Sequence, residues 1–429
     1  MTAKKELRGG LLFAWGANSY GQLGLGHKED VLLPVRVTQG LASIGNIKCL
    51  VGGGGHSAII TELGELLLCG HNHKGQLGMG HKQEVLYFCC CPSLQGRIVV
   101  QVACGWDFTL ILTDDGTIWT CGSNAFGQLG LPQHLGESTL PLPIETLNGN
   151  AVEIAAGLRH ALAVTAEKGL VFQWGVGMKS LANRGLQTLP VPAFMSAREP
   201  YEVPGLGHVK VKHVSAGAYH SACITDEGCL FVWGSNKYGQ LPSSDDFLPL
   251  PFFIQPHHFE GEKVTLVCSG WTHMVARTEK GQVYTCGRAD YGQLGRKIKS
   301  IQDSMCKSNV IQSRFTPEKV SELTGASQEI PFCHGVGTST ACVEMEPKST
   351  FVNPSRFLSS IITYQQRSAL GLGTRWLCAG QQDRVAEISK GALKSRLFVR
   401  GILRQPQPDL TRCATVAEDF YDMTRRSRD

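Results

Sequence analysis

The sequence predicts an all-β protein, a β-propeller, on three observations. A pattern of about 53 residues recurs along the first 300 residues, each unit holds several short apolar runs joined by glycine-rich turns, and helical periodicity is absent. This period suits one four-stranded propeller blade. A single blade cannot bury its own apolar faces, so blades must stack on one another to fold.

The first element of the pattern is an apolar run that ends in Trp-Gly or Cys-Gly. Six such pairs occur, separated by 54, 52, 53, 59 and 53 residues. They are Trp15-Gly16, Cys69-Gly70, Cys121-Gly122, Trp174-Gly175, Trp233-Gly234 and Cys286-Gly287.

A Gly-Gln-Leu loop follows five of the six pairs, and only the unit after Trp174 lacks it. Glycine permits backbone conformations and close approaches that other residues resist, so we predict an architectural role for this loop. Its glycines and glutamines are Gly21, Gln22, Gly24, Gly75, Gln76, Gly78, Gly127, Gln128, Gly130, Gly239, Gln240, Gly292, Gln293 and Gly295.

Upstream of the pairs after the first, a second signature recurs: a strand, a Gly-x-x-His corner, a second strand and a Thr-x-x-Gly hairpin. The corner histidines are His56, His160, His220 and His273, and Phe108 interrupts the series. A metal is one interpretation, but the repeat places each histidine on a different blade, whereas ligands must converge within about 2 Å of one ion. We therefore predict no metal site, and expect local bonds to the backbone instead.

The phase of the repeat predicts how the chain ends meet. The strand at residues 11–16 lacks the strands that precede it in other units, so its partner should come from late in the chain, with residues 329–338 as the candidate. Such pairing removes exposed sheet edges. We expect an extension at 1–10, propeller repeats at 11–296, a degenerate closing blade at 297–345 and a divergent, poorly ordered tail at 346–429.

The Trp-Gly, Gly-Gln-Leu-Gly and Gly-x-x-His motifs at this period resemble the repeats of the regulator of chromosome condensation family. That resemblance covers residues 11–296 and implies a nominally seven-bladed propeller, here with about six recognisable units. It also implies a cytoplasmic and nuclear protein, nucleotide exchange on a small GTPase, and a link to secretion through an exocyst subunit. The last 133 residues contain no recognisable unit, which departs from the family.

Charge and hydropathy exclude several classes. Residues 1–296 carry 22 Lys and Arg against 23 Asp and Glu, and residues 297–429 carry 19 against 13. A near-neutral body argues against nucleic acid as a partner, because phosphate-binding surfaces need clustered cations. No run approaches about 18 apolar residues and the start has no apolar signal segment, so we expect no membrane insertion and no secretion. We interpret the 16 cysteines as reduced thiols.

Motifs for covalent chemistry are missing from the sequence. The glycines at 52–55 are not followed by the Gly-Lys-Ser/Thr of a phosphate loop, and no Gly-x-Ser-x-Gly elbow occurs. Cys89-Cys90-Cys91 lacks a second pair of ligands, and adjacent side chains on a strand point to opposite faces. We predict no catalytic residue, no metal and no cofactor.

Without a catalytic or metal site, the remaining function is the binding of a partner protein. The candidate binding residues are those at which the repeats differ from one another. Equivalent corners gather at one end of a propeller, where large aromatic and arginine side chains would form a binding ring. The alternative is that the tryptophans pack between blades. The candidates are Trp106, Asp107, Arg159, Tyr219 and Trp271 in the corners, with Arg288 and Asp290 after a Cys-Gly strand.

Three functions remain open at this point. The first is a guanine nucleotide exchange factor or adaptor for a small GTPase, as the resemblance implies. The second is a propeller scaffold that binds an exocyst subunit or another protein without promoting exchange. The third is a hydrolytic propeller enzyme, which would need ionisable residues converging in the central tunnel.

Overall fold

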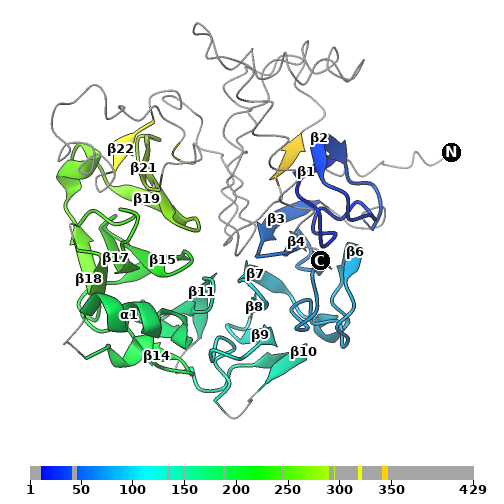
Figure 1. Cartoon of the computed structure of the whole chain (residues 1–429), viewed down its shortest axis with the longest axis horizontal. Helices are drawn as coiled ribbons and strands as arrows, with labels where there is room; N and C mark the ends of the chain where they lie inside the picture. The colour runs from blue at the N-terminus through cyan, green and yellow to red at the C-terminus, as the bar shows by residue number, and fades with distance from the viewer. Residues whose placement is uncertain are drawn as a thin grey trace, which may run out of the picture. The chain divides into compact units, whose positions relative to one another are not determined.

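The computed structural model describes residues 11–40, 46–132, 136–147, 150–186, 190–243, 245–288, 294, 317–320 and 341–345. All of them lie in the first of two compact units, Met1–Cys378. They form five four-stranded antiparallel sheets and one three-stranded sheet, which confirms the β-propeller (Figure 1). Of the nominal seven blades, six sheets are found within these residues.

Each four-stranded sheet contains its strands in chain order, joined by hydrogen bonds between neighbours. The sheets are β3 (Ile47–Gly52), β4 (His56–Thr61), β5 (Leu66–Gly70) and β6 (Val85–Cys90); β7 (Val99–Cys104), β8 (Phe108–Thr113), β9 (Ile118–Ser123) and β10 (Glu137–Pro143); β11 (Ala151–Ala156), β12 (Ala161–Thr165), β13 (Val171–Trp174) and β14 (Tyr201–Glu202); β15 (Val211–Ala216), β16 (His220–Thr225), β17 (Leu230–Ser235) and β18 (Phe247–Ile254); and β19 (Val264–Ser269), β20 (His273–Thr278), β21 (Val283–Gly287) and β22 (Glu318–Lys319).

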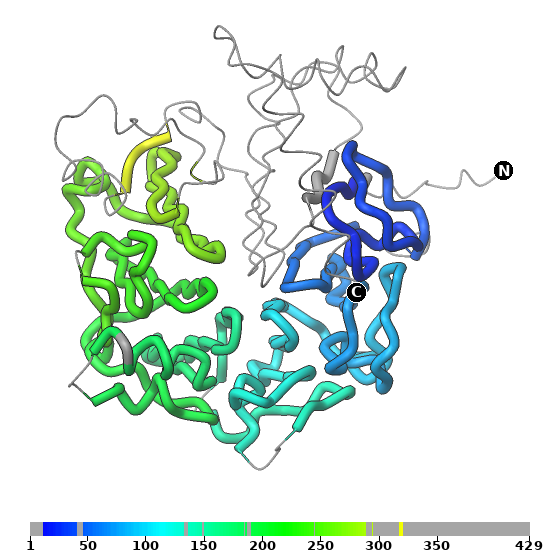
Figure 2. The backbone as a smooth tube through the Cα atoms, in the orientation of Figure 1, coloured from blue at the N-terminus to red at the C-terminus, as the bar shows by residue number. Residues whose placement is uncertain are grey.

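The first strands of the sheets contact one another from β3 through β7, β11 and β15 to β19, and in Figure 2 the sheets follow one another in chain order. The ends of these strands carry small side chains, because strands that converge leave no room for larger ones. Ala103, Ala156, Ala216 and Ser269 are among the residues that line a small cavity between them.

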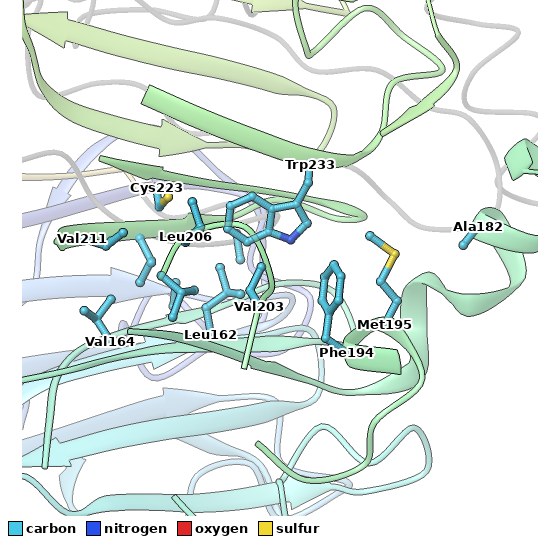
Figure 3. Close-up of a cluster of buried hydrophobic side chains, with 14 of the residues drawn as sticks. Leu162, Val164, Ala182, Phe194, Met195, Val203, Leu206, Val211, Cys223 and Trp233 are labelled. Atoms are coloured by element: carbon cyan, nitrogen blue, oxygen red, sulfur yellow. The ribbon is translucent and has the colours of Figure 1, made fainter. Parts of the chain in front are cut away.

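Apolar side chains fill the space between successive sheets. Between the sheets of β12 and β16, for example, Leu162 and Val164 pack in one cluster with Val211, Cys223 and Trp233 (Figure 3). Every residue of β4, β8 and β16 is buried, since these middle strands are covered on both faces. Apolar residues therefore fill the middle of each of these strands, and the polar residues at their ends are buried as well.

The unit without a Gly-Gln-Leu loop replaces it with helical turns. After β13 come the 3-10 turn η2 (Val176–Met178), helix α1 (Lys179–Leu186) and the 3-10 turn η3 (Ala193–Met195). Met178, Ala182, Phe194 and Met195 are buried, and the last three belong to the cluster drawn in Figure 3. Two further 3-10 turns, η1 (Pro92–Leu94) and η4 (Pro256–Phe259), follow β6 and β18.

The remaining sheet joins the beginning of the chain to a late segment. Its order is β2 (Val31–Arg36), β1 (Leu11–Gly16) and β23 (Ala341–Met345). β1 and β23 are antiparallel, with Trp15 opposite Ala341. The isolated position of β1 in the sequence predicts such a partner, but the strand observed is 341–345, and the candidate at 329–338 lies outside the described residues. The extension at 1–10 and the tail at 346–429 also lie outside them.

Candidate functional site

The Gly-Gln-Leu loops share one hydrogen-bonding scheme. After β1, the Asn18 side-chain oxygen accepts a bond from the Leu23 amide at 3.0 Å, and the Gln22 side-chain oxygen accepts one from the Tyr20 amide at 2.9 Å. Equivalent bonds hold the loops after β5, β9 and β17. The glutamine side chains therefore form hydrogen bonds within their own loops. Of the fifth loop, Gly292, Gln293 and Gly295 lie outside the described residues.

Trp174 and three cysteines near the ends of third strands make the same kind of hydrogen bond, although their side chains differ. The Trp174 indole N–H donates to the Gln128 carbonyl at 3.0 Å, and the Cys121 thiol donates to the Gln76 carbonyl at 3.4 Å. Cys69 and Cys286 bond the preceding loop in the same way. Either side chain can make this bond, because the indole and the thiol each carry one hydrogen-bond donor. No disulfide joins the described cysteines.

Two of the corner histidines, His56 and His160, link one sheet to the next. His56 Nε2 donates to the Thr109 hydroxyl at 2.8 Å, and that hydroxyl donates to the Gln76 carbonyl at 2.7 Å. His160 Nε2 lies 3.1 Å from the Ser221 hydroxyl. The expectation of local backbone bonds is therefore wrong for these two, whose partners are side chains of the following sheet.

The residue that faces each corner from the next sheet also explains why Phe108 stands in place of a histidine. The residue that would face it from the next sheet is Ala161, which has no hydroxyl, and both belong to one apolar cluster. Burial lowers the pKa of His56 and His220 to about 3 and that of His160 and His273 to about 4, so all four are neutral near pH 7. No group of three His, Cys, Asp or Glu side chains within the described residues could hold a metal ion.

Three of the predicted partner-binding residues come together. The rings of Trp106 and Trp271 meet edge to face with centroids 5.4 Å apart, although they stand 165 positions apart in the sequence. Tyr219 packs with them around Leu158 and Ala218. The tryptophans thus contact each other at the convergence of the corners, and all three aromatic rings are only partly buried.

The residues that follow the third strands lie at this same end. The backbone amides of Ser123, Ser235 and Arg288 donate to the corner carbonyls of Asp107, Tyr219 and Thr272, at 2.9, 2.8 and 2.9 Å. The corner candidates and Arg288 therefore belong to one surface.

The charged candidates on this surface are held by neighbours. The Arg159 guanidinium lies 4.1 Å from the centre of the Phe126 ring, and the Arg288 guanidinium 5.0 Å from that of Tyr238. Asp107 accepts a hydrogen bond from the Gln128 side chain at 3.2 Å. Burial raises the pKa of Asp107, opposed by this bond and by the charge of Arg159. Asp290 lies outside the described residues.

A stack of three rings that the sequence reasoning missed extends this surface. Tyr20 stacks on His71 and His71 on His73, each with centroids 4.0 Å apart. A Cβ on Gly55 would lie 2.9 Å from the Tyr20 ring, so the stack covers the first corner. Burial and the charge of His73 lower the pKa of His71 to about 4. The sequence does single out these two residues, because the other units have no histidine at the positions of His71 and His73.

We call these residues the corner surface. They offer broad aromatic faces with two arginines and one carboxylate, and Trp, Tyr and Arg are the residues that dominate protein-protein hot spots. The corner surface consists of Tyr20, His71, His73, Trp106, Asp107, Phe126, Arg159, Tyr219, Tyr238, Trp271 and Arg288.

Comparison with known families decides the class of this propeller. The RCC1-like domain matches residues 11–346, which span the sheets and the corner surface. The chain belongs to the RCC1-like domain family. This RCC1-like chain is 55% identical over 324 residues to the secretion-regulating guanine nucleotide exchange factor of Mus musculus, a match that covers 74% of this chain and 69% of the relative. The Bos taurus protein of that name matches with the same identity and coverage.

Solved structures of lower identity share the fold of this RCC1-like chain. Prp20p from Saccharomyces cerevisiae superposes with a TM-score of 0.60 at 22% identity, over 78% of this chain and 79% of its own. Human WBSCR16 gives a TM-score of 0.59 at 23% identity, over 76% and 82%. In the described part of the chain, no helix is long and apolar enough to cross a membrane.

Proposed function

We propose that this chain is a guanine nucleotide exchange factor for a small GTPase and acts in the regulation of secretion. The observation that carries the proposal is the 55% identity over 324 residues to two proteins that bear this name. A second support comes from Prp20p, whose crystal structure is described together with its binding to Gsp1p and histones.

The corner surface suits this activity because exchange needs binding and no covalent step. An exchange factor accelerates nucleotide release when it binds the nucleotide-free GTPase more tightly than the loaded one. Trp106, Tyr219 and Trp271 supply a central aromatic contact, and Arg159 can pair with a carboxylate of the partner while Phe126 holds its guanidinium in place.

The direct test is the release of fluorescent GDP from a panel of secretory and nuclear small GTPases. We expect faster release from at least one of them in the presence of the chain. No acceleration from any GTPase at stoichiometric protein would contradict the proposal. A GTPase that is captured while its release stays at the background rate would instead assign an adaptor or scaffold role.

The first prediction places the activity on the corner surface. Trp271→Ala should lower the exchange rate at subsaturating protein by about 10- to 30-fold, since a central aromatic hot spot contributes about 2 kcal/mol. Trp119→Ala is the matched control, because Trp119 is also partly buried but lies on β9 beneath Arg97. Equal rates for the two variants, with folding checked by circular dichroism, would remove the corner surface from the proposal.

We also propose an exocyst subunit as a second partner and a cytoplasmic and nuclear location. The name of the relatives supports the link to secretion alone, and the exocyst subunit rests on the resemblance of the repeat motifs. Affinity capture of the tagged chain followed by probing for exocyst subunits tests the partner, and cell fractionation tests the location. Exclusive recovery from a membrane or secreted fraction would contradict the location.

A further inference from the structure

Two exposed apolar side chains, Leu63 and Ile98, stand on adjoining backbone segments. Leu63, in the hairpin between β4 and β5, is 72% exposed, and Ile98, just before β7, is 51% exposed. The Val99 amide donates to the Gly64 carbonyl at 2.9 Å, and a Cβ on Gly64 would come within 2.6 Å of the Ile98 side chain. These contacts hold the two residues, which we call the apolar pair, in fixed positions.

Three other junctions between sheets have polar residues at the same two positions. Each hairpin has a glycine whose carbonyl accepts a hydrogen bond from the next first strand, so the positions can be matched from sheet to sheet. The matched pairs are Asp115 and Asn150, Lys168 and Lys210, and Glu227 and Lys263. Among these four junctions of the described chain, the apolar pair is the one departure from polarity.

The charge beside the apolar pair departs in the same way. In the hairpin between β16 and β17, the Asp226 amide donates to the Lys210 carbonyl at 2.9 Å, and the two side chains form an ion pair at 3.7 Å. The Asp114 amide makes the equivalent bond to the Ile98 carbonyl at 3.0 Å. Because isoleucine carries no charge, Asp114 has no cation at the position where Asp226 has one.

The other charged groups nearby do not replace that cation. Arg97, the residue before Ile98, pairs with Asp115 at 4.0 Å. Glu62, the residue before Leu63, is a second exposed carboxylate. Within the ranges that the structure describes, no ion pair involves Asp114 or Glu62. The apolar pair is therefore flanked by two carboxylates that a partner can reach.

We propose that the apolar pair is a docking site for a protein segment that carries apolar side chains between two basic residues. The apolar side chains of the segment cover the apolar pair, and its lysines or arginines pair with Glu62 and Asp114. Exposed apolar area supplies the affinity, and charge complementarity selects a basic partner over an acidic one. The fixed backbone at the site keeps the cost of ordering it small.

This docking site is separate from the corner surface. β4 begins at the corner residue His56 and ends at Thr61, next to the hairpin that carries Leu63. The hairpin and the corner therefore lie at opposite ends of the sheet. The inference thus adds a second binding surface to the one used in the proposed function.

Fluorescence anisotropy with a defined peptide and the full-length chain tests this proposal. The probe is the labelled peptide Gly-Ser-Lys-Phe-Leu-Lys-Ser-Gly, and its counterpart has glutamates in place of the lysines. We expect saturable binding of the lysine peptide, with a Kd at least about 10-fold lower than that of the glutamate peptide, because like charges repel at the site. Bound peptide should also slow hydrogen exchange at residues 62–64 and 97–99.

Ile98→Lys is the decisive variant. It places a lysine beside Asp114, as Lys210 stands beside Asp226, so the fold should accept it. The Kd of the lysine peptide should rise at least about 10-fold, a loss of about 1.4 kcal/mol. Leu250→Lys is the matched control, because Leu250 is also 51% exposed but lies on β18. It should leave the Kd unchanged.

Each outcome of this experiment decides the question. Equal affinity of Ile98→Lys and the natural chain, equal affinity for the two peptides, or no saturable binding of the lysine peptide would overturn the proposal. If Ile98→Lys lowers Tm, then Ile98→Asn gives the same comparison with the residue type found at Asn150. Trp271→Ala should bind the lysine peptide as the natural chain does, so either surface can fail its test while the other passes.

Discussion

At the scale of single residues, the repeat keeps a hydrogen bond and not a residue type. Trp174 and Cys121 both donate to a glutamine carbonyl of the preceding loop, which explains why two unlike side chains alternate at one position. The corners obey a similar rule: His56 faces the Thr109 hydroxyl, whereas Phe108 faces Ala161. An apparent irregularity in one repeat is thus matched by a change in the next.

The buried corner histidines predict how stability depends on pH. Burial lowers the pKa of His220 to about 3 in the folded chain, while an unfolded histidine has a pKa near 6.5. Below about pH 6.5 the unfolded chain therefore binds protons that the folded chain does not. The free energy of unfolding should fall as the pH falls from about 6.5 to 4, by up to about 1.4 kcal/mol per pH unit for each such histidine.

His220→Phe tests this directly. His56 faces Thr109 in the next sheet, and the residue in the equivalent position opposite His220 is Met274. Met274 has no hydroxyl, so a phenylalanine ring should fit at position 220, as it does at Phe108. Between pH 6.5 and 4.5 the variant should lose about 2 kcal/mol less stability than the natural chain. Urea unfolding at several pH values measures this difference. Parallel pH profiles would show that His220 is not the titrating group.

At the scale of elements, the repeat predicts the strands well and the interruptions poorly. Three strands of each four-stranded sheet follow from the Trp-Gly, corner and hairpin motifs. α1 and its flanking turns could not be predicted, because the segment after Trp174 has no counterpart in the other units. The late partner of β1 is found at 341–345, whereas the candidate at 329–338 lies outside the described residues and stays a prediction.

The loop glycines give a prediction at this scale. Gly75 has a φ of +81°, and a Cβ there would lie 2.6 Å from the Thr139 Cα of the next sheet. Gly75→Ala should lower the free energy of unfolding by at least about 1–2 kcal/mol, the cost of left-handed backbone for alanine, with the clash in addition. Gly136→Ala is the control, since nothing lies within 4 Å of a Cβ there. Urea unfolding that finds the two variants equally stable would contradict the close packing.

The candidate site shows what symmetry can and cannot predict. The repeat implies that the corners gather at one end, and Trp106, Tyr219 and Trp271 do so. That the two tryptophans touch could not be predicted, because it depends on how sharply the intervening sheets turn. The stack of His71 on His73 lies in a loop beside the first corner, where the repeat itself predicts no aromatic contact.

At the scale of the whole molecule, the described sheets depend on pairing between distant parts of the chain. β1 stands at the beginning and its neighbour β23 lies more than 300 residues later. A long-range pair of this kind is slow to form, because a long loop must close first, and it joins the beginning of the chain to a late segment within one sheet. Disrupting β23 should therefore destabilise β1, at residues 11–16.

Proline in β23 tests this dependence. Alternate amides of an antiparallel strand point toward its neighbour, so either Cys342→Pro or Val343→Pro must remove a hydrogen bond to β1. We expect one variant to lower Tm and to increase hydrogen exchange of residues 11–16 selectively, and the other to have a weaker effect. Unchanged exchange of residues 11–16 in both variants would show that the pairing does not stabilise β1.

The contact between Trp106 and Trp271 has an optical consequence. Two indoles 5.4 Å apart and steeply inclined couple their excited states, so they should contribute a paired signal to the near-ultraviolet circular dichroism. Both rings belong to the corner surface and are only partly buried. A partner that docks there would change their angle or their exposure. The chain therefore carries its own spectroscopic reporter of partner binding, and no label needs to be attached.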